Sequence, residues 1–314
     1  MTAALRTMNQ IEIPERIRRV GVIGLGLMGD AIAHNILKRG FALTVLAHRS
    51  RTNVDALVAR GATEAASAEE LARSVDVVLI SVTGTPQVRD VLTREHGLLA
   101  GAHAGLIVID ATTADPEFAE EAATALAARG AQFVDAPVNR TPKEAREGRL
   151  NVLVGGETEV VETLRPLFET YAETIHHLGQ AGSGYRAKLI HNFIAQANAA
   201  VLAEAFGTAA KAGVDLREFA ALCRLSGGHS RTFDRIVPYV LEGDDSGQQF
   251  ALRNALKDMR AYARLAGEHA STAIVAEAAR QLYLLATNLG YGDEYVPHLF
   301  DVVGELNGVR VRAD

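Results

Sequence analysis

The sequence has very little cysteine and no long apolar run, and each absence excludes a class of protein. Cys223 is the only cysteine, which excludes an intramolecular disulfide framework and a multi-cysteine metal site. No segment reaches the roughly 18 consecutive apolar residues that a membrane span requires. Residues 1–19 contain no apolar core of the kind found in signal peptides. We therefore expect a cytoplasmic protein in a reducing compartment.

An excess of positive charge is also missing. The chain holds 32 Lys and Arg residues against 38 Asp and Glu residues, a formal net charge of −6. Nucleic acids and anionic membrane surfaces attract basic proteins, so this balance argues against either as the main partner.

What is present is the composition of a globular protein long enough for two domains. The 314 residues exceed the roughly 150 typical of one domain, and 48% of them are hydrophobic. In the first half, short β-branched runs alternate with helical stretches, and strands are predicted at 20–23, 41–46, 75–82, 106–110, 132–135 and 152–154. This alternation predicts parallel strands joined by crossover helices, a Rossmann-type doubly wound sheet.

The second half lacks this alternation and shows only helical patterns. The longest runs from 184 to 212, and others cover 216–225, 254–266 and 274–289. We therefore expect an α/β domain over 1–181 and an all-α domain over 182–314, joined by the long helix.

A glycine motif follows the first predicted strand directly, with the sequence Gly24-Leu25-Gly26-Leu27-Met28-Gly29. In this G-x-G-x-x-G pattern the first glycine makes a tight turn, the second admits a pyrophosphate and the third lets helix pack on strand. The helix N-terminus supplies amide donors and the positive end of its dipole. The strand before and the helix after favour a dinucleotide site over a merely structural turn.

The residues after the second predicted strand favour NADP over NAD. NAD sites usually carry an acidic residue about 20 residues beyond the glycines. Here Leu46 is followed by Ala47, His48, Arg49, Ser50 and Arg51, with no carboxylate before Asp55. A guanidinium at this place suits a 2′-phosphate, and a solvated basic turn is the alternative. We predict that His48, Arg49 and Ser50 contact NADP.

The predicted long helix begins with an unusual polar pair. Its first residues are Gly182-Ser183-Gly184-Tyr185-Arg186-Ala187-Lys188-Leu189-Ile190-His191-Asn192. Lys188 and Asn192 are four residues apart and project from the same face, with His191 beside them. A lysine next to an amide on otherwise apolar turns is a poor choice for packing alone. The alternative is a surface lysine whose stem covers apolar surface.

With these residues the chain resembles the β-hydroxyacid dehydrogenase family, the relatives of 3-hydroxyisobutyrate dehydrogenase, over nearly its whole length. Residues 24–29 match the family's cofactor loop G-L-G-x-M-G, and residues 182–192 match G-x-G-x-x-x-K-x-x-N-N. Asp135-Ala136-Pro137-Val138 matches the start of D-A-P-V-S-G-G. Asp110-Ala111-Thr112-Thr113 resembles the D-x-S-T segment, and Phe250 with Lys257-Asp258 resembles the K-D element.

The resemblance implies a role for each matched residue. Lys188 would protonate the substrate's carbonyl oxygen as hydride arrives, and would act as base in reverse. Asn192 would orient the substrate hydroxyl or its anionic group. Further contacts are expected from Val82, Thr83, Thr112 and Lys257 to the cofactor, and from Thr113, His191 and Lys257 to the substrate. Imine reductases share the architecture but usually lack the lysine.

The chain departs from the family where Asn139-Arg140-Thr141 replaces S-G-G and where His191 replaces the first asparagine. A similar G-R-T occurs in the sulfolactaldehyde reductase branch. A guanidinium suits an oxyanion, so we expect Asn139, Arg140 and Thr141 to bind a carboxylate, sulfonate or phosphonate tail. The alternative is an ion pair of Arg140 with Glu144 or Glu147 in its own loop.

These patterns predict an NADP-dependent 3-hydroxyacid dehydrogenase or semialdehyde reductase that acts on CH–OH groups of a small anionic substrate. A sulfolactaldehyde reductase is one alternative, and a non-catalytic NADP-binding sensor is another. The Walker, G-x-S-x-G and H-E-x-x-H motifs are missing, and no metal site is predicted. The family commonly forms dimers or tetramers, so a homodimer or homotetramer is expected.

Overall fold

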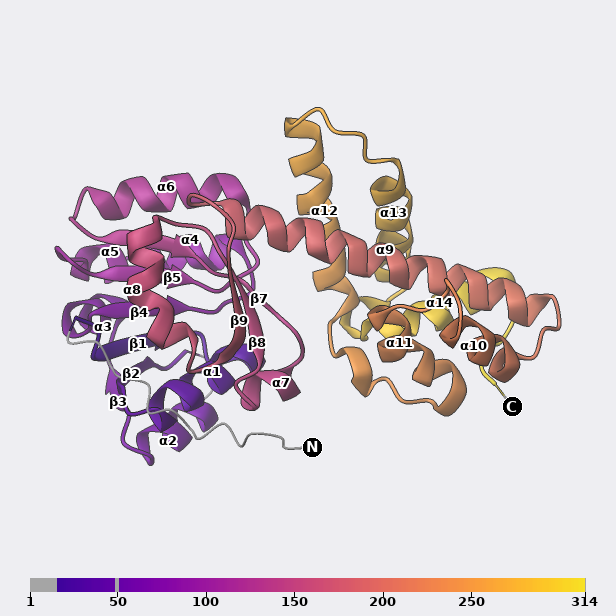
Figure 1. The fold of residues 1–314 in the computed structure, drawn as a ribbon, viewed down its shortest axis with the longest axis horizontal. Coiled ribbons are helices and arrows are strands. Elements are labelled where there is room, and N and C mark those ends of the chain that lie inside the picture. Colours follow the sequence, from indigo (N-terminus) through magenta and orange to yellow (C-terminus); the bar gives the residue numbers. More distant parts are fainter. Residues whose placement is uncertain (1–15, 49–50, 314) are drawn as a thin grey trace, which may run out of the picture. The chain divides into compact units, whose positions relative to one another are not determined.

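The computed structural model describes residues 16–48 and 51–313, and the chain divides into two compact units between Lys188 and Leu189 (Figure 1). Helix α9 (Ser183–Lys211) begins in the first unit and continues into the second. The domain limits of 1–181 and 182–314 stay a prediction.

The first unit is built of alternating strands and helices. Its strands are β1 (Arg19–Ile23), β2 (Ala42–Leu46), β3 (Thr63–Ala65), β4 (Val77–Ile80), β5 (Ile107–Asp110), β6 (Gln132–Asp135), β7 (Val138–Asn139), β8 (Leu150–Val154) and β9 (Ala172–His177). Its helices before α9 are α1 (Leu27–Lys38), α2 (Thr52–Val58), α3 (Ala68–Ser74), α4 (Thr85–Thr93), α5 (Leu98–Gly101), α6 (Pro116–Ala127), α7 (Pro142–Arg146) and α8 (Thr158–Phe168).

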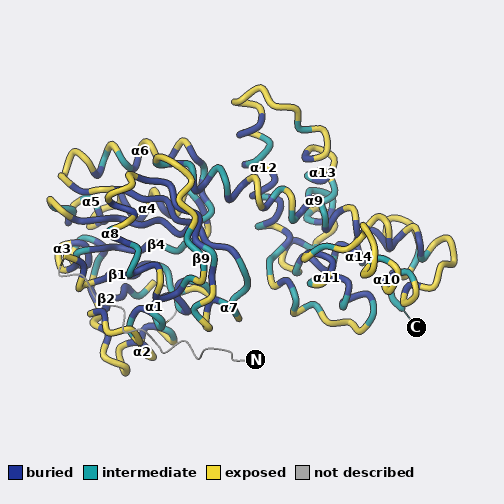
Figure 2. The backbone as a smooth tube through the Cα atoms, viewed as in Figure 1, coloured by how far each residue is buried: buried dark blue, intermediate teal, exposed yellow. Residues whose placement is uncertain are grey.

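Strands β1 to β6 form one parallel sheet in the order β3-β2-β1-β4-β5-β6. Val22 and Leu79 pack in a core with α1, α2 and α8, whereas Val78 and Ile80 pack in another core with α3, α4 and α6. Side chains of a strand alternate between the two faces, so helices cover both (Figure 2). This confirms the predicted doubly wound sheet, in which all carboxyl ends share one edge.

A second, three-stranded sheet follows in the same unit. β7 pairs antiparallel with β8, and β8 pairs parallel with β9. Strands β3, β7 and β9 were not predicted. β3 and β7 are three and two residues long, too short to show a period. β9 is only partly buried and ends in two histidines, so it lacks an apolar run.

The second unit is helical, which confirms the predicted all-α half. Besides the rest of α9 it contains α10 (Leu216–Arg224), α11 (Arg231–Glu242), η1 (Ser246–Gln248), α12 (Leu252–Glu268), α13 (Ile274–Asn288), η2 (Tyr291–Asp293), η3 (Val296–His298) and α14 (Leu299–Asn307). Phe206 lies at the centre of its core, against the rings of Phe219, Phe233 and Phe300. Over residues 16–48 and 51–313, no helix is long and apolar enough to cross a membrane.

Candidate active site

The glycine motif forms the turn between β1 and α1, and its three glycines differ in what they require. Gly24 has a φ of +96°, and a Cβ on it would overlap the backbone oxygen of Ser81. A Cβ on Gly29 would overlap the backbone oxygen of Gly24. A Cβ on Gly26 would meet no atom within 4 Å. The protein's own packing therefore requires Gly24 and Gly29, whereas the space beside Gly26 is open and fits a bound group.

The start of α1 supplies donors to that open space. Gly26 is the N-cap, and the first intrahelical hydrogen bond runs from Asp30 N to Gly26 O at 2.9 Å. The amides of Leu27, Met28 and Gly29 therefore precede the intrahelical ladder, as anion-binding amides do. Asn53 of α2 holds the loop by donating from Nδ2 to the backbone oxygen of Leu25 at 2.8 Å. These features fit the pyrophosphate of a dinucleotide.

The region that decides between NADP and NAD is only partly described. His48 follows β2 and is exposed, and Arg49 and Ser50 lie outside the described residues. Arg51 pairs with Glu64 at 2.9 Å and with Asp55 at 3.0 Å. The hydrogen bonds with these carboxylates raise the pKa of Arg51 above its ordinary value. Arg51 is thus tied to the carboxylates of its own unit.

The ends of β4 and β5 are joined by hydrogen bonds. Val82 N donates to Thr112 Oγ1 at 3.1 Å, and Thr112 N donates to Asp110 Oδ1 at 2.8 Å. Thr83 and Thr113 follow directly on these two ends, exposed and half-buried respectively. The residues predicted to contact cofactor or substrate in this region therefore follow neighbouring strand ends at the carboxyl edge of the sheet.

Lys188 is buried, with 9% of its surface exposed. Its Nζ donates to the backbone oxygen of Val138 at 2.8 Å and to Oδ1 of Asn139. Both acceptors belong to β7, the first strand after the D-A-P segment. A surface lysine would place its ammonium in water, and Lys188 does not. Asn139, predicted to contact substrate, contacts the lysine.

Two buried carboxylates hold the first turn of α9. Asp135, the last residue of β6, accepts from the amides of Gly182 at 2.6 Å and Tyr185 at 2.8 Å. The hydroxyl of Tyr185 donates to Asp110 Oδ2 at 2.5 Å. Burial raises the pKa of Asp135 to about 6 even though the two amides lower it, and nearby Asp110 adds to the rise. Burial also raises the pKa of Tyr185 well above its ordinary value, so its hydroxyl remains a donor.

Neither carboxylate was assigned a role from the sequence. Asp110 and Asp135 were visible there only as letters of family motifs, and Tyr185 only as a variable position within one. The available signal was an aspartate at the end of each of two predicted strands. A carboxylate that is buried there needs hydrogen-bond donors to offset the loss of water.

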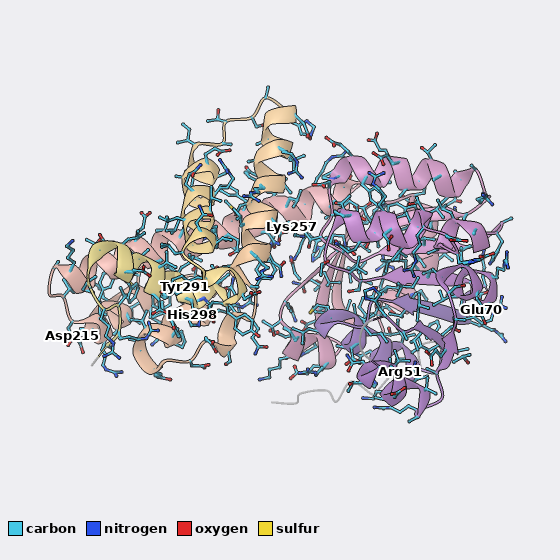
Figure 3. All side chains as sticks on the ribbon, turned by 180° about the vertical axis from the view of Figure 1, so that it is seen from behind. Arg51, Glu70, Asp215, Lys257, Tyr291 and His298 are labelled. Atoms are coloured by element: carbon cyan, nitrogen blue, oxygen red, sulfur yellow. The ribbon has the colours of Figure 1, made fainter. Side chains whose placement is uncertain are left out.

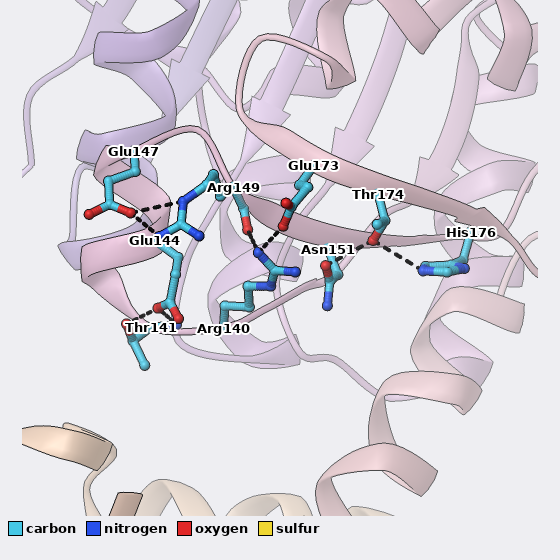
Figure 4. Close-up of polar contacts among 9 residues, drawn as sticks. All are labelled: Arg140, Thr141, Glu144, Glu147, Arg149, Asn151, Glu173, Thr174 and His176. Carbon is cyan, nitrogen blue, oxygen red and sulfur yellow. Dashed lines mark hydrogen bonds and ion pairs between the residues drawn. The ribbon is translucent and has the colours of Figure 1, made fainter. Parts of the chain in front are cut away.

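Arg140 follows β7 in the left-handed region, with a φ of +89°. Its Nη1 donates to the backbone oxygen of Arg149 at 2.6 Å and to the carboxylate of Glu173 on β9 (Figure 4). Both contacts use Nη1, and Nε and Nη2 carry the other three N–H donors of the guanidinium.

The loop carboxylates offered by the sequence as partners of Arg140 have other contacts. Glu144 accepts from the backbone and hydroxyl of Thr141 in a capping box at the start of α7. Glu147 pairs with Arg149 (Figure 4). Thr141, predicted to contact substrate, thus serves as a helix cap.

In the second unit, one buried carboxylate links two predicted site residues. Asn192 is buried and its Nδ2 donates to Asp258 Oδ2 at 2.6 Å. Nζ of Lys257, on α12 (Figure 3), lies 3.1 Å from Asp258 Oδ1. His191 Nδ1 lies 3.4 Å from Asn192 Oδ1. Asp258 was named in the K-D element but not recognised as the partner of Asn192, which lies 66 residues earlier.

Comparison with known proteins covers both halves of the chain. Residues 19–179 match the family model described as the NAD binding domain of 6-phosphogluconate dehydrogenase. Residues 182–300 match the model described as NAD-binding of NADP-dependent 3-hydroxyisobutyrate dehydrogenase. The NAD-dependent L-serine dehydrogenase of Pseudomonas aeruginosa is 31% identical, over 91% of this chain and 98% of that protein.

Solved structures show the same architecture. The 3-hydroxyisobutyrate dehydrogenase of Salmonella typhimurium has a TM-score of 0.81 and 30% identity, covering 90% of this chain and 99% of that one. Psf3, in complex with NADP+ and 2-OPP, has a TM-score of 0.80 and 29% identity, with the same coverage.

The first matched region contains the glycine loop and the parallel sheet, and the second contains the lysine helix. The two matched models are of NAD(P)-binding parts of dehydrogenases, and the named relatives are dehydrogenases of CH–OH groups. The chain is therefore an NAD(P)-binding oxidoreductase, and it belongs to the β-hydroxyacid dehydrogenase family.

Proposed function

We propose that the chain is an NADP-dependent 3-hydroxyacid dehydrogenase that acts as a reductase of short anionic semialdehydes, with Lys188 as general acid and base. The observation that carries this proposal is the buried ammonium of Lys188, held by the two residues of β7. When bound, the nicotinamide supplies or accepts the hydride. Residues 24–29 and the first turn of α1 hold its pyrophosphate.

Lys188 is suited to move the proton. The oxygens of Val138 and Asn139 are neutral acceptors, so these contacts orient Nζ without cancelling its charge. An oriented ammonium donates a proton to the carbonyl oxygen and stabilises the negative charge that develops there. In the oxidative direction the neutral amine takes the hydroxyl proton.

Replacing Lys188 with alanine tests this role. Turnover of a semialdehyde should fall by about 10²- to 10⁴-fold, the usual contribution of one general acid. Quenching or enhancement of NADPH fluorescence should report unchanged cofactor binding. Lys211→Ala is the matched control, because Lys211 is the last residue of the same helix and its Nζ donates to the backbone oxygen of Asn307. A Lys188→Ala enzyme with near-normal turnover refutes the proposal.

The preference for NADP rests on the residues after β2. They include no carboxylate before Asp55, and the guanidinium of an arginine at position 49 suits a 2′-phosphate. Psf3 was solved with NADP+, whereas the Pseudomonas relative is named as NAD-dependent. Arg49→Asp should therefore raise the KM for NADPH far more than the KM for NADH. Equal increases would contradict the preference.

The anionic substrate is proposed from Arg140 and from the relatives. L-serine and 3-hydroxyisobutyrate, named for two of these relatives, each carry a carboxylate and a hydroxyl on the third carbon. In Arg140, Nε and Nη2 supply the donors for such a tail while Nη1 holds Glu173. Arg140→Gly should reorder the activities on succinic semialdehyde, tartronate semialdehyde and sulfolactaldehyde. An unchanged order would make Arg140 structural, and sulfolactaldehyde as the best wild-type substrate would indicate a sulfolactaldehyde reductase.

Self-association is part of the proposal. In the second unit α9 exposes Ile190, Ile194 and Val201, with 46%, 55% and 61% of their surfaces accessible. Exposed aliphatic side chains on one helix suit a contact with another copy of the chain. Light scattering should report a dimer or tetramer, and a monomer at assay concentration would contradict this.

A further inference from the structure

Tyr185 lies one helical turn before Lys188 and is completely buried. Its ring packs in the apolar core that also contains Val108 of β5 and Phe118 of α6. A phenylalanine would fill such a core equally well. The hydroxyl instead reaches Asp110 Oδ2 at 2.5 Å, and Asp110 is itself completely buried. The contact therefore serves a need other than packing.

Burying a carboxylate is costly unless hydrogen bonds compensate for the lost water. Asp110 accepts from donors in different parts of the chain, which include the amide of Thr112 and the hydroxyl of Tyr185, 75 residues distant. Thr112 in turn accepts from the amide of Val82. Hydrogen bonds thus run without interruption from the end of β4, through the end of β5, to the helical turn that carries Lys188.

The same turn is fastened on its other side by Asp135, which accepts from the amides of Gly182 and Tyr185. Tyr185 is therefore held at two points, by its backbone and by its side chain. A rotation of this turn about the helix axis would break both contacts. Since Lys188 follows three residues later, these contacts also set the direction in which its side chain leaves the helix.

We propose that Tyr185 and Asp110 are positioning residues, which hold Lys188 in register with the strand ends where the cofactor contacts Val82 and Thr112 are expected. This inference rests on the proposed role of Lys188 as general acid. Neither Tyr185 nor Asp110 is expected to touch the substrate. Their effect on the reaction passes through the placement of the Lys188 ammonium.

Tyr185→Phe tests the inference, because it removes one oxygen and keeps the ring. A small misplacement of a reacting group can cost up to about 10²-fold in rate, so we expect kcat to fall roughly tenfold or more. The KM for NADPH should change less than twofold, because this substitution leaves the glycine loop that binds the cofactor unchanged. The limb of the pH–rate profile that depends on Lys188 should also shift, which a purely structural hydroxyl would not cause.

Tyr171→Phe is the matched control. Tyr171 is equally buried in the same unit, and among the described residues its hydroxyl has no hydrogen-bond partner. This variant should keep the wild-type kcat and pH profile. Asp110→Asn is a second test. The amide oxygen of the asparagine can still accept from Thr112 N, and its NH2 group can donate to the phenol oxygen of Tyr185. The fall in kcat should therefore be smaller than the fall caused by Tyr185→Phe.

The Lys188→Ala background separates the possible failures. If Tyr185 acts through Lys188, Tyr185→Phe should cause no further loss when Lys188 is already alanine. A Tyr185→Phe enzyme with wild-type kcat and pH profile overturns the inference, even where its melting temperature falls. If Lys188→Ala alone abolishes turnover in that case, the proposed function stands. If Lys188→Ala is fully active, the proposed function fails, and this inference fails with it.

Discussion

Replacing Asp135 with asparagine should remove a pH dependence of folding stability that this one carboxyl causes. Asp135 is completely buried at the end of β6. Burial raises its pKa from 3.8 to about 6, the amides of Gly182 and Tyr185 oppose the rise, and the charge of Asp110 adds to it. In the unfolded chain the carboxyl returns to its ordinary value.

The sign follows from which state binds the proton more tightly. The folded protein binds the proton of Asp135 more tightly, because the pKa of Asp135 is higher there than in the unfolded chain, so protonation of Asp135 favours folding. Its contribution is fully present below pH 3.8 and is lost as the pH rises through about 6. One pKa unit corresponds to 1.36 kcal/mol, so a shift of about two units makes the lost contribution about 3 kcal/mol.

Urea unfolding of wild type and Asp135→Asn, repeated from pH 4 to pH 8, measures this contribution as the difference between the two curves. Other titrating groups cancel because both proteins contain them. The free energy of unfolding of wild type minus that of Asp135→Asn should decline between about pH 4 and pH 6 and then stay level. A difference that is constant across this range would refute the reasoning.

Asp76 provides a control of opposite sign. Burial acts to raise the pKa of Asp76, but hydrogen bonds from the Arg19 side chain and from the amides of Arg18 and Arg19 lower it below its ordinary value. Its stabilising contribution should therefore be present at neutral pH and be lost as the pH falls. Asp76→Asn should accordingly give a difference curve that rises with pH over the acidic range.

Two further predictions concern the cofactor loop and the end of the chain. Gly26→Ala should weaken NADPH binding at least tenfold in a fluorescence titration. It should leave the free energy of unfolding unchanged, since its Cβ meets only open space. Gly29→Ala should lower the free energy of unfolding by about 2 kcal/mol, because its Cβ overlaps the backbone oxygen of Gly24. Equal destabilisation by both would contradict the different roles of the two glycines. Arg312→Ala should lower the free energy of unfolding by about 1–2 kcal/mol, because Arg312 pairs with Asp301 at 3.0 Å and lies 3.6 Å above the ring of Tyr239. Unchanged urea unfolding would show that the C-terminal contact contributes nothing to stability.

Local patterns in the sequence were enough for the parts of the fold that form within short stretches of chain. β1, the glycine loop and α1 occupy residues 19–38 without interruption, so period and glycine spacing predicted all three. α11 and α14 were missed. α11 contains Pro238, and α14 follows a short 3₁₀ turn that begins at Val296, so neither shows an uninterrupted helical pattern.

The partners of the site residues could not be predicted in this way. The sequence suggested Glu144 or Glu147 as the ion-pair partner of Arg140, because both are near it in the chain. The observed partner is Glu173, 33 residues away, because the pairing of β7, β8 and β9 places it there. Arg49, on which the choice of NADP depends, lies outside the described residues, and that choice stays a prediction.

By itself the sequence determined that this protein has a doubly wound sheet, a dinucleotide loop, a helical second half and a lysine on the long helix. Each is encoded by residues close together in the chain, through side-chain period and glycine spacing. Only the tertiary structure decided that Lys188 is buried against β7 and that Asp110 and Asp135 hold the turn before it. Those contacts join residues 49 to 75 positions apart. The contacts of Asp110 and Asp135 exist because β5 and β6 are parallel and end at the same edge of the sheet. The contacts of Lys188 are with β7, which follows β6 in the chain and pairs with β8 in the second sheet.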